Sequence, residues 1–236
     1  YTKKELEIII NDSKPKYSQR IISEKFKSLT FKKGSLILAD PFYNLKTKIP
    51  VTIEFDLLNN NPEYIQYQII HCNKDWEESN ISTIDALRGF DTDYIENQII
   101  SYGPVQQYIH YIFKIPNQNT DFLISGNYII KIFNEEEPDF PLAFIKFFVS
   151  EQTSKVNFRI NPSTDIEQSN YLQSYELDCS YNSTNTIDPF KNIYVNVQQN
   201  HQYFDEQWLS GPNFIKENKL VFLQDDEQTF NGGNEF

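Results

Sequence analysis

The stretch from Tyr67 to Trp76, YQIIHCNKDW, brings together more potentially reactive side chains than any other part of the chain. His71, Cys72 and Asp75 carry the imidazole, thiol and carboxylate groups that catalytic and metal sites use. His71 and Asp75 could form an acid–base pair. The alternative is that these residues only mark the end of the strand that the preceding isoleucines indicate.

The rest of the sequence does not support a reactive site. The three histidines, His71, His110 and His201, are scattered singly, whereas a zinc site needs closely spaced ligand pairs. The patterns G-x-S-x-G, H-E-x-x-H, C-x-x-C and the phosphate-binding glycine loops are absent. His110 lies in the aromatic run YIHYIF and is predicted to be a packed strand histidine. We therefore predict no catalytic residue, no metal site and no cofactor.

The HCNKDW segment is better explained as a strand end followed by a turn. In this interpretation the carboxylate of Asp75 accepts hydrogen bonds from local backbone amides. Trp76 then either packs in a core or serves as an exposed anchor for a partner, because tryptophan is favoured in both settings.

The elements that position these residues are predicted to be strands. The chain has 236 residues, 39 % of them hydrophobic, with 19 Phe and 15 Tyr, which favours sheet over helix. The net charge of -12, without a basic run, argues against a nucleic-acid partner. No apolar run approaches the roughly 20 residues that a membrane span requires.

Alternating apolar residues define the strands of the first half. Val51, Ile53, Phe55 and Leu57 share one face of a strand, and Ile65, Tyr67 and Ile69 share a face with His71, which puts Cys72 on the other face. The Asn-rich turn between these two strands predicts a hairpin. A second hairpin is predicted around the acidic tip 134–139, and residues 82–94 are the best candidate for a short helix or a structured loop. About seven strands between residues 18 and 150 indicate an antiparallel sandwich.

A second series of strands follows the polar linker 151–155. Tyr175, Leu177, Cys179 and Tyr181 are predicted to share one face, and Ile193, Val195 and Val197 another. Only about five strands fit, so this sandwich would be incomplete or would need a partner strand. Cys72 and Cys179 lie in different halves and are expected to be separate thiols.

The expected organisation is all-β, with two tandem antiparallel β-sandwich domains. Residues 1–17 would form an N-terminal arm, residues 18–150 a first domain like an immunoglobulin or fibronectin type III domain, and residues 155–236 a second domain truncated at its C-terminus. Because the chain starts at Tyr1 and contains no methionine, we expect that an export signal has been removed; a cloning boundary would give the same start.

Several ordered blocks resemble the type IX secretion system plug protein family. They are YQIIHCNKDW, GFDTDYIENQIISY, YIHYIFKIPN and LISGNYIIKIF in the first half, and INPSTDIEQSNYLQ, DPFKNIYVNVQQN and FNGGNEF in the second. The resemblance covers nearly the whole chain from about Arg20. The family chain normally continues well past the last block.

This resemblance implies a non-enzymatic periplasmic protein of Bacteroidetes-type bacteria, without a cofactor, at the inner face of the outer membrane. Its partner would be the giant β-barrel translocon, whose periplasmic opening it would plug. Within the loop 73–104 we expect the contact residues to be Trp76, Phe90, Tyr94 and Tyr102; alternatively these aromatics pack a small core beneath the loop. The competing function is a carbohydrate- or ligand-binding sandwich that uses Trp76 and Trp208 as stacking platforms.

Overall fold

The computed structural model describes residues 20–162, 172–181, 188–199, 206–209, 211–223 and 228–232. The N-terminal arm expected at residues 1–17 lies outside these ranges, as does His201. The chain folds into two compact units, Tyr1–Glu151 and Gln152–Phe236.

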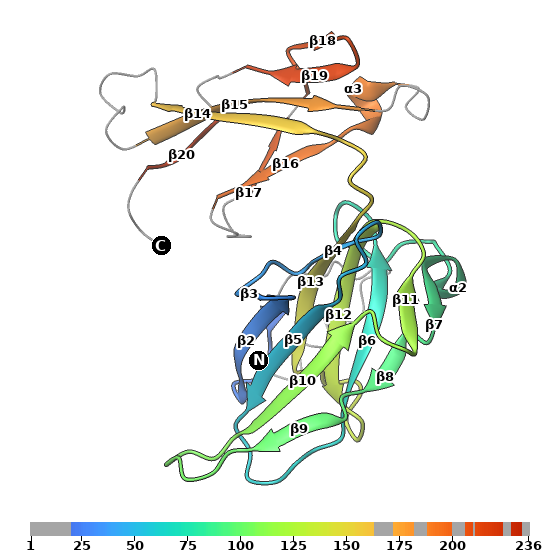
Figure 1. The fold of residues 1–236 in the computed structure, drawn as a ribbon, viewed down its shortest axis with the longest axis vertical. Coiled ribbons are helices and arrows are strands. Elements are labelled where there is room, and N and C mark those ends of the chain that lie inside the picture. Colours follow the sequence, from blue (N-terminus) through green and yellow to red (C-terminus); the bar gives the residue numbers. More distant parts are fainter. Residues whose placement is uncertain are drawn as a thin grey trace. The chain divides into compact units, whose positions relative to one another are not determined.

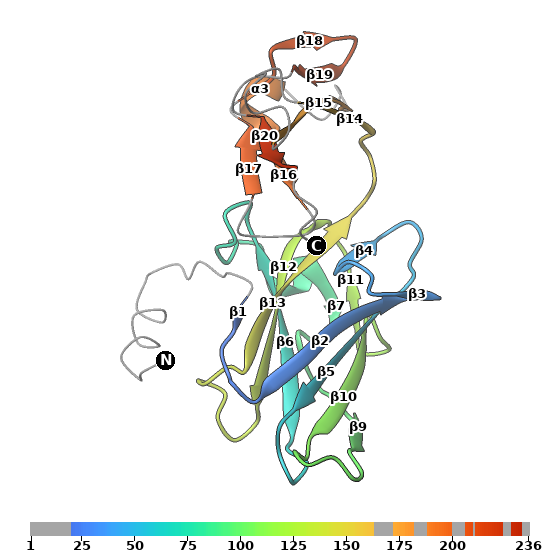
Figure 2. The same cartoon turned by 90° about the vertical axis from the view of Figure 1, so that its left-hand side faces the viewer.

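The first unit is a sandwich of two β-sheets that pack against each other, and Figure 2 shows both sheets side by side. One sheet has the order β1-β13-β12-β6-β8, with β4 alongside β13, and the other has the order β3-β2-β5-β10-β9. The strands of the first sheet are β1 (Arg20–Ile21), β4 (Phe42–Asn44), β6 (Ile65–Cys72), β8 (Thr92–Tyr94), β12 (Gly126–Asn134) and β13 (Ala143–Ser150). Those of the second are β2 (Phe26–Lys33), β3 (Leu36–Ile37), β5 (Val51–Leu57), β9 (Asn97–Ile100) and β10 (Ile109–Ile115).

The core between the sheets follows from the period-2 alternation of the central strands. The predicted apolar faces of β5 and β6 are both buried in one cluster, and β10, β12 and β13 add their alternate residues to it. Phe55 stacks between Phe26 and Tyr111, with ring centroids 4.5 and 5.3 Å away. Each such buried ring contributes roughly 1.5–3 kcal/mol through removal of apolar surface from water.

The predicted hairpin between residues 51–57 and 65–72 is wrong. β5 pairs with β2 and β10, whereas β6 pairs with β12 and β8, so the two strands lie in opposite sheets. Each has one fully buried face, and in opposite sheets these faces can cover each other. The turn between them therefore crosses the sandwich. The predicted hairpin around the acidic tip is confirmed, because β12 and β13 pair antiparallel.

A small third layer follows β6. Residues 82–94 were predicted to form a short helix or a structured loop, and the helix α2 covers Thr83–Ala86. The Ser82 side chain caps this helix by accepting a hydrogen bond from the Asp85 amide. The chain continues into β7 (Leu87–Gly89), which pairs with β11 (Thr120–Phe122) as a two-stranded sheet. Figure 1 shows α2, β7 and β11 beside the main sheets.

The second unit is built on a five-stranded sheet of order β14-β15-β19-β18, with β20 also paired to β15, and on the separate pair β16–β17. Its elements are β14 (Val156–Pro162), β15 (Leu172–Ser180), α3 (Pro189–Asn192), β16 (Val195–Gln198), β17 (Glu206–Leu209), β18 (Phe214–Lys216), β19 (Lys219–Phe222) and β20 (Thr229–Asn231). The two predicted faces of this half, one on β15 and one around β16, meet in a single core.

The edge strand β14 leaves apolar surface exposed in this unit. Val156, Phe158 and Ile160 stand opposite the buried residues Cys179, Leu177 and Tyr175, and therefore lie on the core side of the sheet. All three are nevertheless exposed, at 60, 44 and 61 %. The core side of this sheet is thus exposed over β14.

Candidate interaction surface

His71 is placed in a packed position at the end of β6. Its Nδ1 is hydrogen-bonded to the Ser79 hydroxyl at 2.6 Å, and its ring meets Tyr128 edge-on at 4.9 Å. Burial lowers the pKa of His71, because it disfavours the charged imidazolium. No contact of the described structure joins His71 to Asp75, whose carboxylate instead accepts a hydrogen bond from Lys74. The geometry does not provide the acid–base pair that the sequence left open.

The turn after β6 is organised by Asn73 rather than by Asp75. The Asn73 side-chain oxygen accepts hydrogen bonds from the amides of Asp75 and Glu77, at 2.9 and 3.0 Å. The role expected of Asp75 is therefore wrong. Asparagine and aspartate side chains are equally long, and either can accept a hydrogen bond from the backbone amide two residues further along the chain. Here Asn73 takes this role.

Trp76 lies beneath the loop and not on its surface. The residue is 6 % exposed and packs with Cys72 and Ile129 on the outer side of the larger sheet. Its ring meets that of Phe148 edge-on, with centroids 5.2 Å apart. Trp76 thus belongs to a satellite core, the alternative that the sequence left open for it. Its buried ring cannot serve as the stacking platform that a carbohydrate site would need.

The remaining candidates for metal or redox chemistry are also accounted for by packing. Within the described ranges, no three His, Cys, Asp or Glu side chains come close enough together to hold a metal ion. Cys72 and Cys179 are both free and buried, in different units. The ring of His110 lies 2.7 Å from the Asp56 carboxylate, its cross-strand neighbour on β5.

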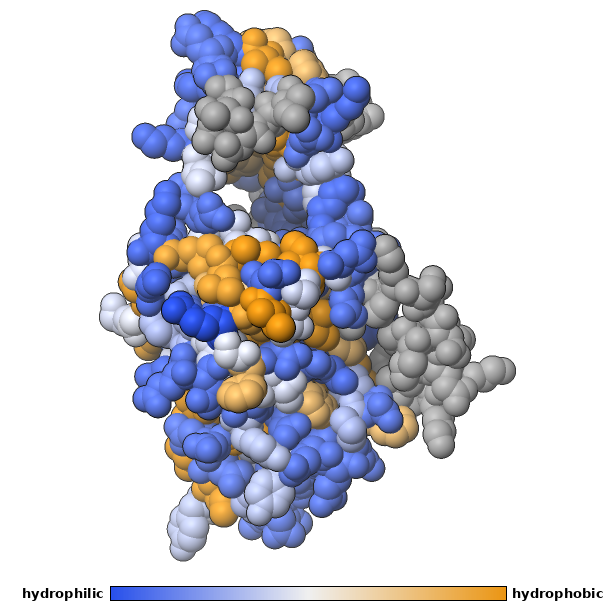
Figure 3. Space-filling model, turned by 90° about the vertical axis from the view of Figure 1, so that its right-hand side faces the viewer, coloured by the Kyte–Doolittle hydropathy of each residue, from blue (hydrophilic) through white to orange (hydrophobic). Residues whose placement is uncertain are grey.

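Phe90 directly follows β7, and we use the name α2–β7–β11 patch for the exposed apolar side chains on or next to α2, β7 and β11, which are Ile81, Ile84, Phe90 and Leu123. Alternation along the β7–β11 pair places Phe90 and Leu123 on its outer side, together with an ion pair of 2.6 Å between Arg88 and Asp121. Figure 3 faces this side of the unit and shows apolar side chains gathered there around charged ones.

The patch is held in place by a close backbone contact. The Phe90 amide donates to the carbonyl of Asn119, and the Thr120 hydroxyl donates to the carbonyl of Phe90. Gly89 has φ +99°, and a Cβ at this position would lie 1.9 Å from the Asn119 carbonyl oxygen. Only glycine fits here. Sequence reasoning singled out Phe90 but missed Ile81 and Ile84, whose apolar character in a polar loop was the available signal.

Tyr94 ends β8 at the edge of the larger sheet. Its hydroxyl donates a hydrogen bond to the carboxylate of Glu135, which raises the pKa of Tyr94 because the hydrogen bond and the negative charge favour the protonated phenol. Beside it lies an open hollow of about 380 Å³, lined in part by Tyr64, Glu63 and Glu96. This edge therefore combines exposed phenol rings with negative charge.

Tyr102 lies in the loop between β9 and β10 and is fully exposed, as is Val105. The four predicted contact residues therefore do not form one cluster. Trp76 is in the satellite core, Phe90 follows the β7–β11 pair, and Tyr94 and Tyr102 are associated with edge strands of different sheets.

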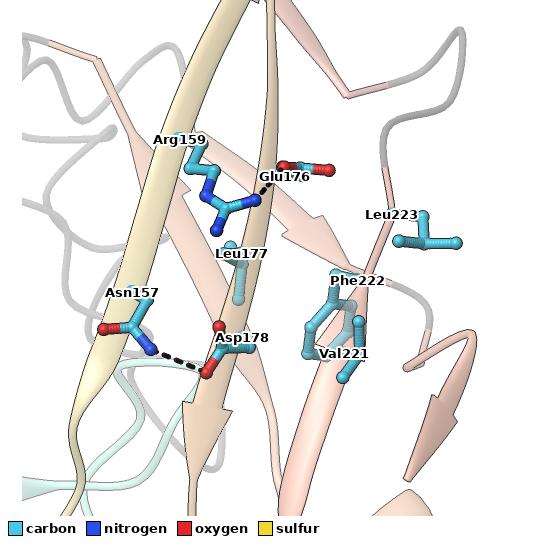
Figure 4. A pocket seen from close by; sticks show the side chains of 8 residues that line it. All are labelled: Asn157, Arg159, Glu176, Leu177, Asp178, Val221, Phe222 and Leu223. Atoms are coloured by element: carbon cyan, nitrogen blue, oxygen red, sulfur yellow. Dashed lines mark hydrogen bonds and ion pairs between the residues drawn. The ribbon is translucent and has the colours of Figure 1, made fainter. Parts of the chain in front are cut away.

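The second unit offers a shallow groove of about 130 Å³ across the polar side of its sheet (Figure 4). Each of its charged side chains has a partner, and the ion pair of Asp178 is with Lys219 at 3.4 Å. Arg159 pairs with Glu176 at 3.2 Å, and Asn157 donates to Asp178 at 2.8 Å. Because the described charged groups of the groove already pair with one another or with neighbouring side chains, the exposed apolar surfaces of the first unit are the better candidates for recognition.

None of the helices in the described residues is long and apolar enough to cross a membrane. Comparison with known families gives a match to the type 9 secretion system plug protein 1st domain over residues 26–151, more than half of the chain. No curated protein matches.

A crystal structure of a hypothetical protein from Parabacteroides merdae is similar to this chain, with a TM-score of 0.86 and 26 % identity. The match covers 94 % of this chain and 56 % of that one, so this chain spans little more than half the length of its structural relative. A Pseudomonas fluorescens alkylpurine DNA glycosylase matches with a TM-score of only 0.30 and 12 % identity, which is too weak to bear on the fold.

Proposed function

Because the chain belongs to the type 9 secretion system plug protein family, we propose that it closes the periplasmic opening of the outer-membrane β-barrel translocon of that system. In this role the protein is non-enzymatic and uses no cofactor. It resides in the periplasm at the inner face of the outer membrane. The family match over the first unit is the observation that carries the proposal.

The requirements of a plug agree with the chemistry of the first unit. A barrel wide enough to pass proteins would leak small molecules unless a folded body blocks it. Such a body needs a rigid core and contact surfaces that can be released. The first unit has a continuous core of buried aromatic and branched side chains, and exposed apolar residues occur on its peripheral elements. Apolar contacts provide affinity on burial, while surrounding polar groups permit release.

The proposed contact residues are those of the loop 73–104. Phe90, Tyr94 and Tyr102 offer accessible rings, of the kind that dominate interface energetics. Trp76 supports this surface from beneath, because its packing holds the turn that follows β6. The net charge of -12 keeps the unbound protein soluble despite this apolar surface.

Binding to the translocon tests the proposal directly. Outer membranes are solubilised in detergent, the barrel is purified without its plug, and the affinity of this protein for it is measured. In cells, deletion of the protein should make the outer membrane permeable to an antibiotic that is normally excluded. The absence of binding together with an unchanged permeability would refute the proposed function.

Matched variants locate the contact. Phe90→Ala should weaken binding by about tenfold or more if the ring enters the interface. Ile37→Ala is the control, because Ile37 is 68 % exposed on β3, away from the loop 73–104. Equal affinities for both variants would exclude the α2–β7–β11 patch from the contact.

A further inference from the structure

The hairpin formed by β9 and β10 extends from the body of the first unit, with its connecting loop at the lower left of Figure 1. β9 is an edge strand of the five-stranded sheet, and all four of its residues are exposed. Beyond it, Tyr102 and Val105 occupy the tip of the loop and are fully exposed.

The hairpin is also unusual in its charge. Between Glu96 and Lys114 there is no Asp, Glu, Lys or Arg over residues 97–113. At the chain average of 23 %, these 17 residues would contain about four charged side chains. The charge-free stretch includes four exposed apolar side chains, those of Ile99, Ile100, Tyr102 and Val105. A protruding segment that lacks charge and exposes apolar groups is a surface suited to burial against a partner.

The loop is joined to the ladder by defined hydrogen bonds. The Ser101 amide donates to the Tyr108 carbonyl at 3.0 Å, and the Tyr108 amide donates to the Ser101 hydroxyl at 2.9 Å. Gly103, at φ +89°, provides the left-handed turn, and Pro104 restricts the backbone next to it. A constrained tip loses less conformational entropy on binding than a free loop would.

The register between β9 and β10 also determines which backbone groups of β9 point toward the free edge of the sheet. Because Ser101 and Tyr108 face each other as a hydrogen-bonded pair, alternation makes Ile99–His110 the next such pair. The backbone groups of Gln98 and Ile100 then point away from β10, toward the free edge of β9. A partner can therefore meet backbone groups along the edge and apolar side chains at the tip.

We propose that this hairpin inserts into an apolar pocket of a protein partner, with Tyr102 and Val105 as its anchors. This inference rests on the proposed function, so the partner is the translocon barrel, and the hairpin is the part of the protein that enters it. A lipid surface fits less well. Surface-binding segments use Lys and Arg against anionic lipids, whereas residues 97–113 of this hairpin contain neither and the chain carries a charge of -12.

The test compares the wild-type protein with Val105→Asp and Tyr102→Ser, and with Ile37→Asp as the control on the opposite edge of the same sheet. Affinity for the purified barrel is measured at low and high salt. Both tip variants should bind at least tenfold more weakly, Val105→Asp most of all, because a buried carboxylate loses its hydration. Ile37→Asp should bind like the wild type. Superimposable urea unfolding curves would establish that the tip variants are folded.

A photocrosslinking amino acid at position 102 should react with the barrel and not with lipid. If the wild-type protein binds and both tip variants bind equally well, the insertion is refuted while the proposed function stands. If the wild type does not bind, both fall. Binding to vesicles of phosphatidylethanolamine and phosphatidylglycerol that is lost in Val105→Asp, without a change in barrel affinity, would replace the protein pocket with a membrane surface.

Discussion

The side-chain nitrogen of Lys146 lies 4.4 Å from the centroid of the Trp76 ring. Lys146 is on β13 and Trp76 follows β6, so this contact ties the turn to a strand two positions away in the same sheet. Both residues are 6 % exposed. An ammonium over an indole face is an attractive arrangement, and it is stronger where water is excluded.

Removing the Trp76 ring should destabilise the first unit. Trp76→Ala opens a cavity beside Phe148 and takes the aromatic face away from Lys146, so we expect a loss of about 3 kcal/mol in the free energy of unfolding. Trp76→Phe keeps part of the packing and should lose less. Urea unfolding followed by circular dichroism measures both. A loss below about 1 kcal/mol for Trp76→Ala would mean that the satellite core contributes little.

Two glycines with similar backbone angles should respond differently to alanine. Gly89 and Gly103 have φ of +99° and +89°, but a Cβ at Gly89 meets the Asn119 carbonyl oxygen, whereas at Gly103 it meets nothing within 4 Å. Gly103→Ala should cost only the strain of the left-handed backbone, about 1 kcal/mol. Gly89→Ala should cost more than about 3 kcal/mol, because β7 and β11 must separate. Equal losses in urea unfolding would contradict the close approach.

Periodicity predicted which face of each central strand is buried, but it could not predict the strand partners. Val51 to Leu57 and Ile65 to Cys72 follow each other along the chain and look alike, yet they belong to opposite sheets. Alternation of apolar residues shows only that one face of a strand is buried. Two successive strands can bury such faces either as a hairpin within one sheet or by crossing to opposite sheets. The crossover is favoured by packing against strands that are distant in sequence.

The placement of Trp76 shows a similar limit for the candidate site. Trp76 and Tyr102 both lie in the segment 73–104, which was predicted to be one long loop but contains α2, β7, β8 and β9, and one of them is buried while the other is fully exposed. Trp76 adopts φ +62°, and its packing partners Lys146 and Phe148 come from β13. Neither the unusual backbone angle nor the distant partner can be read from the local sequence. The absence of charge around Tyr102, in contrast, is visible in the sequence.

The Cys72 thiol should be protected in the folded protein. Burial, with the negative charge of Glu78 nearby, raises the pKa of Cys72 to about 12 from an ordinary value of 9.0. Reaction with a thiol reagent at about pH 8 should therefore require unfolding. The raised pKa also means that stability is complete below about pH 9 and falls as pH rises toward 12, by at most about 1.4 kcal/mol per pH unit. The Cys72→Ala variant should not show this contribution to the loss of folding stability at alkaline pH.

His71 should make the first unit sensitive to mild acid. Its pKa is lowered from an ordinary value of 6.5 by burial, so the unfolded chain takes up a proton more readily than the folded one. Stability from this group is therefore fully present above about pH 6.5 and is lost as pH falls through the folded pKa. Carboxylates also titrate in acid, but they do so equally in a matched variant. His71→Gln removes the imidazole and can still bond to Ser79.

The difference between the two proteins isolates the contribution of His71. Urea unfolding at about pH 7.5 and about pH 5 should show a larger loss for the wild type than for His71→Gln. The direction of this difference follows from the position of the His71 ring. The ring meets Tyr128 edge-on, and it lies so close to Gly126 that a Cβ added there would be 2.6 Å from its Nε2. A ring confined in this way cannot turn freely toward water when it gains a proton. An equal acid loss in both proteins would show that the imidazole is hydrated in the folded state.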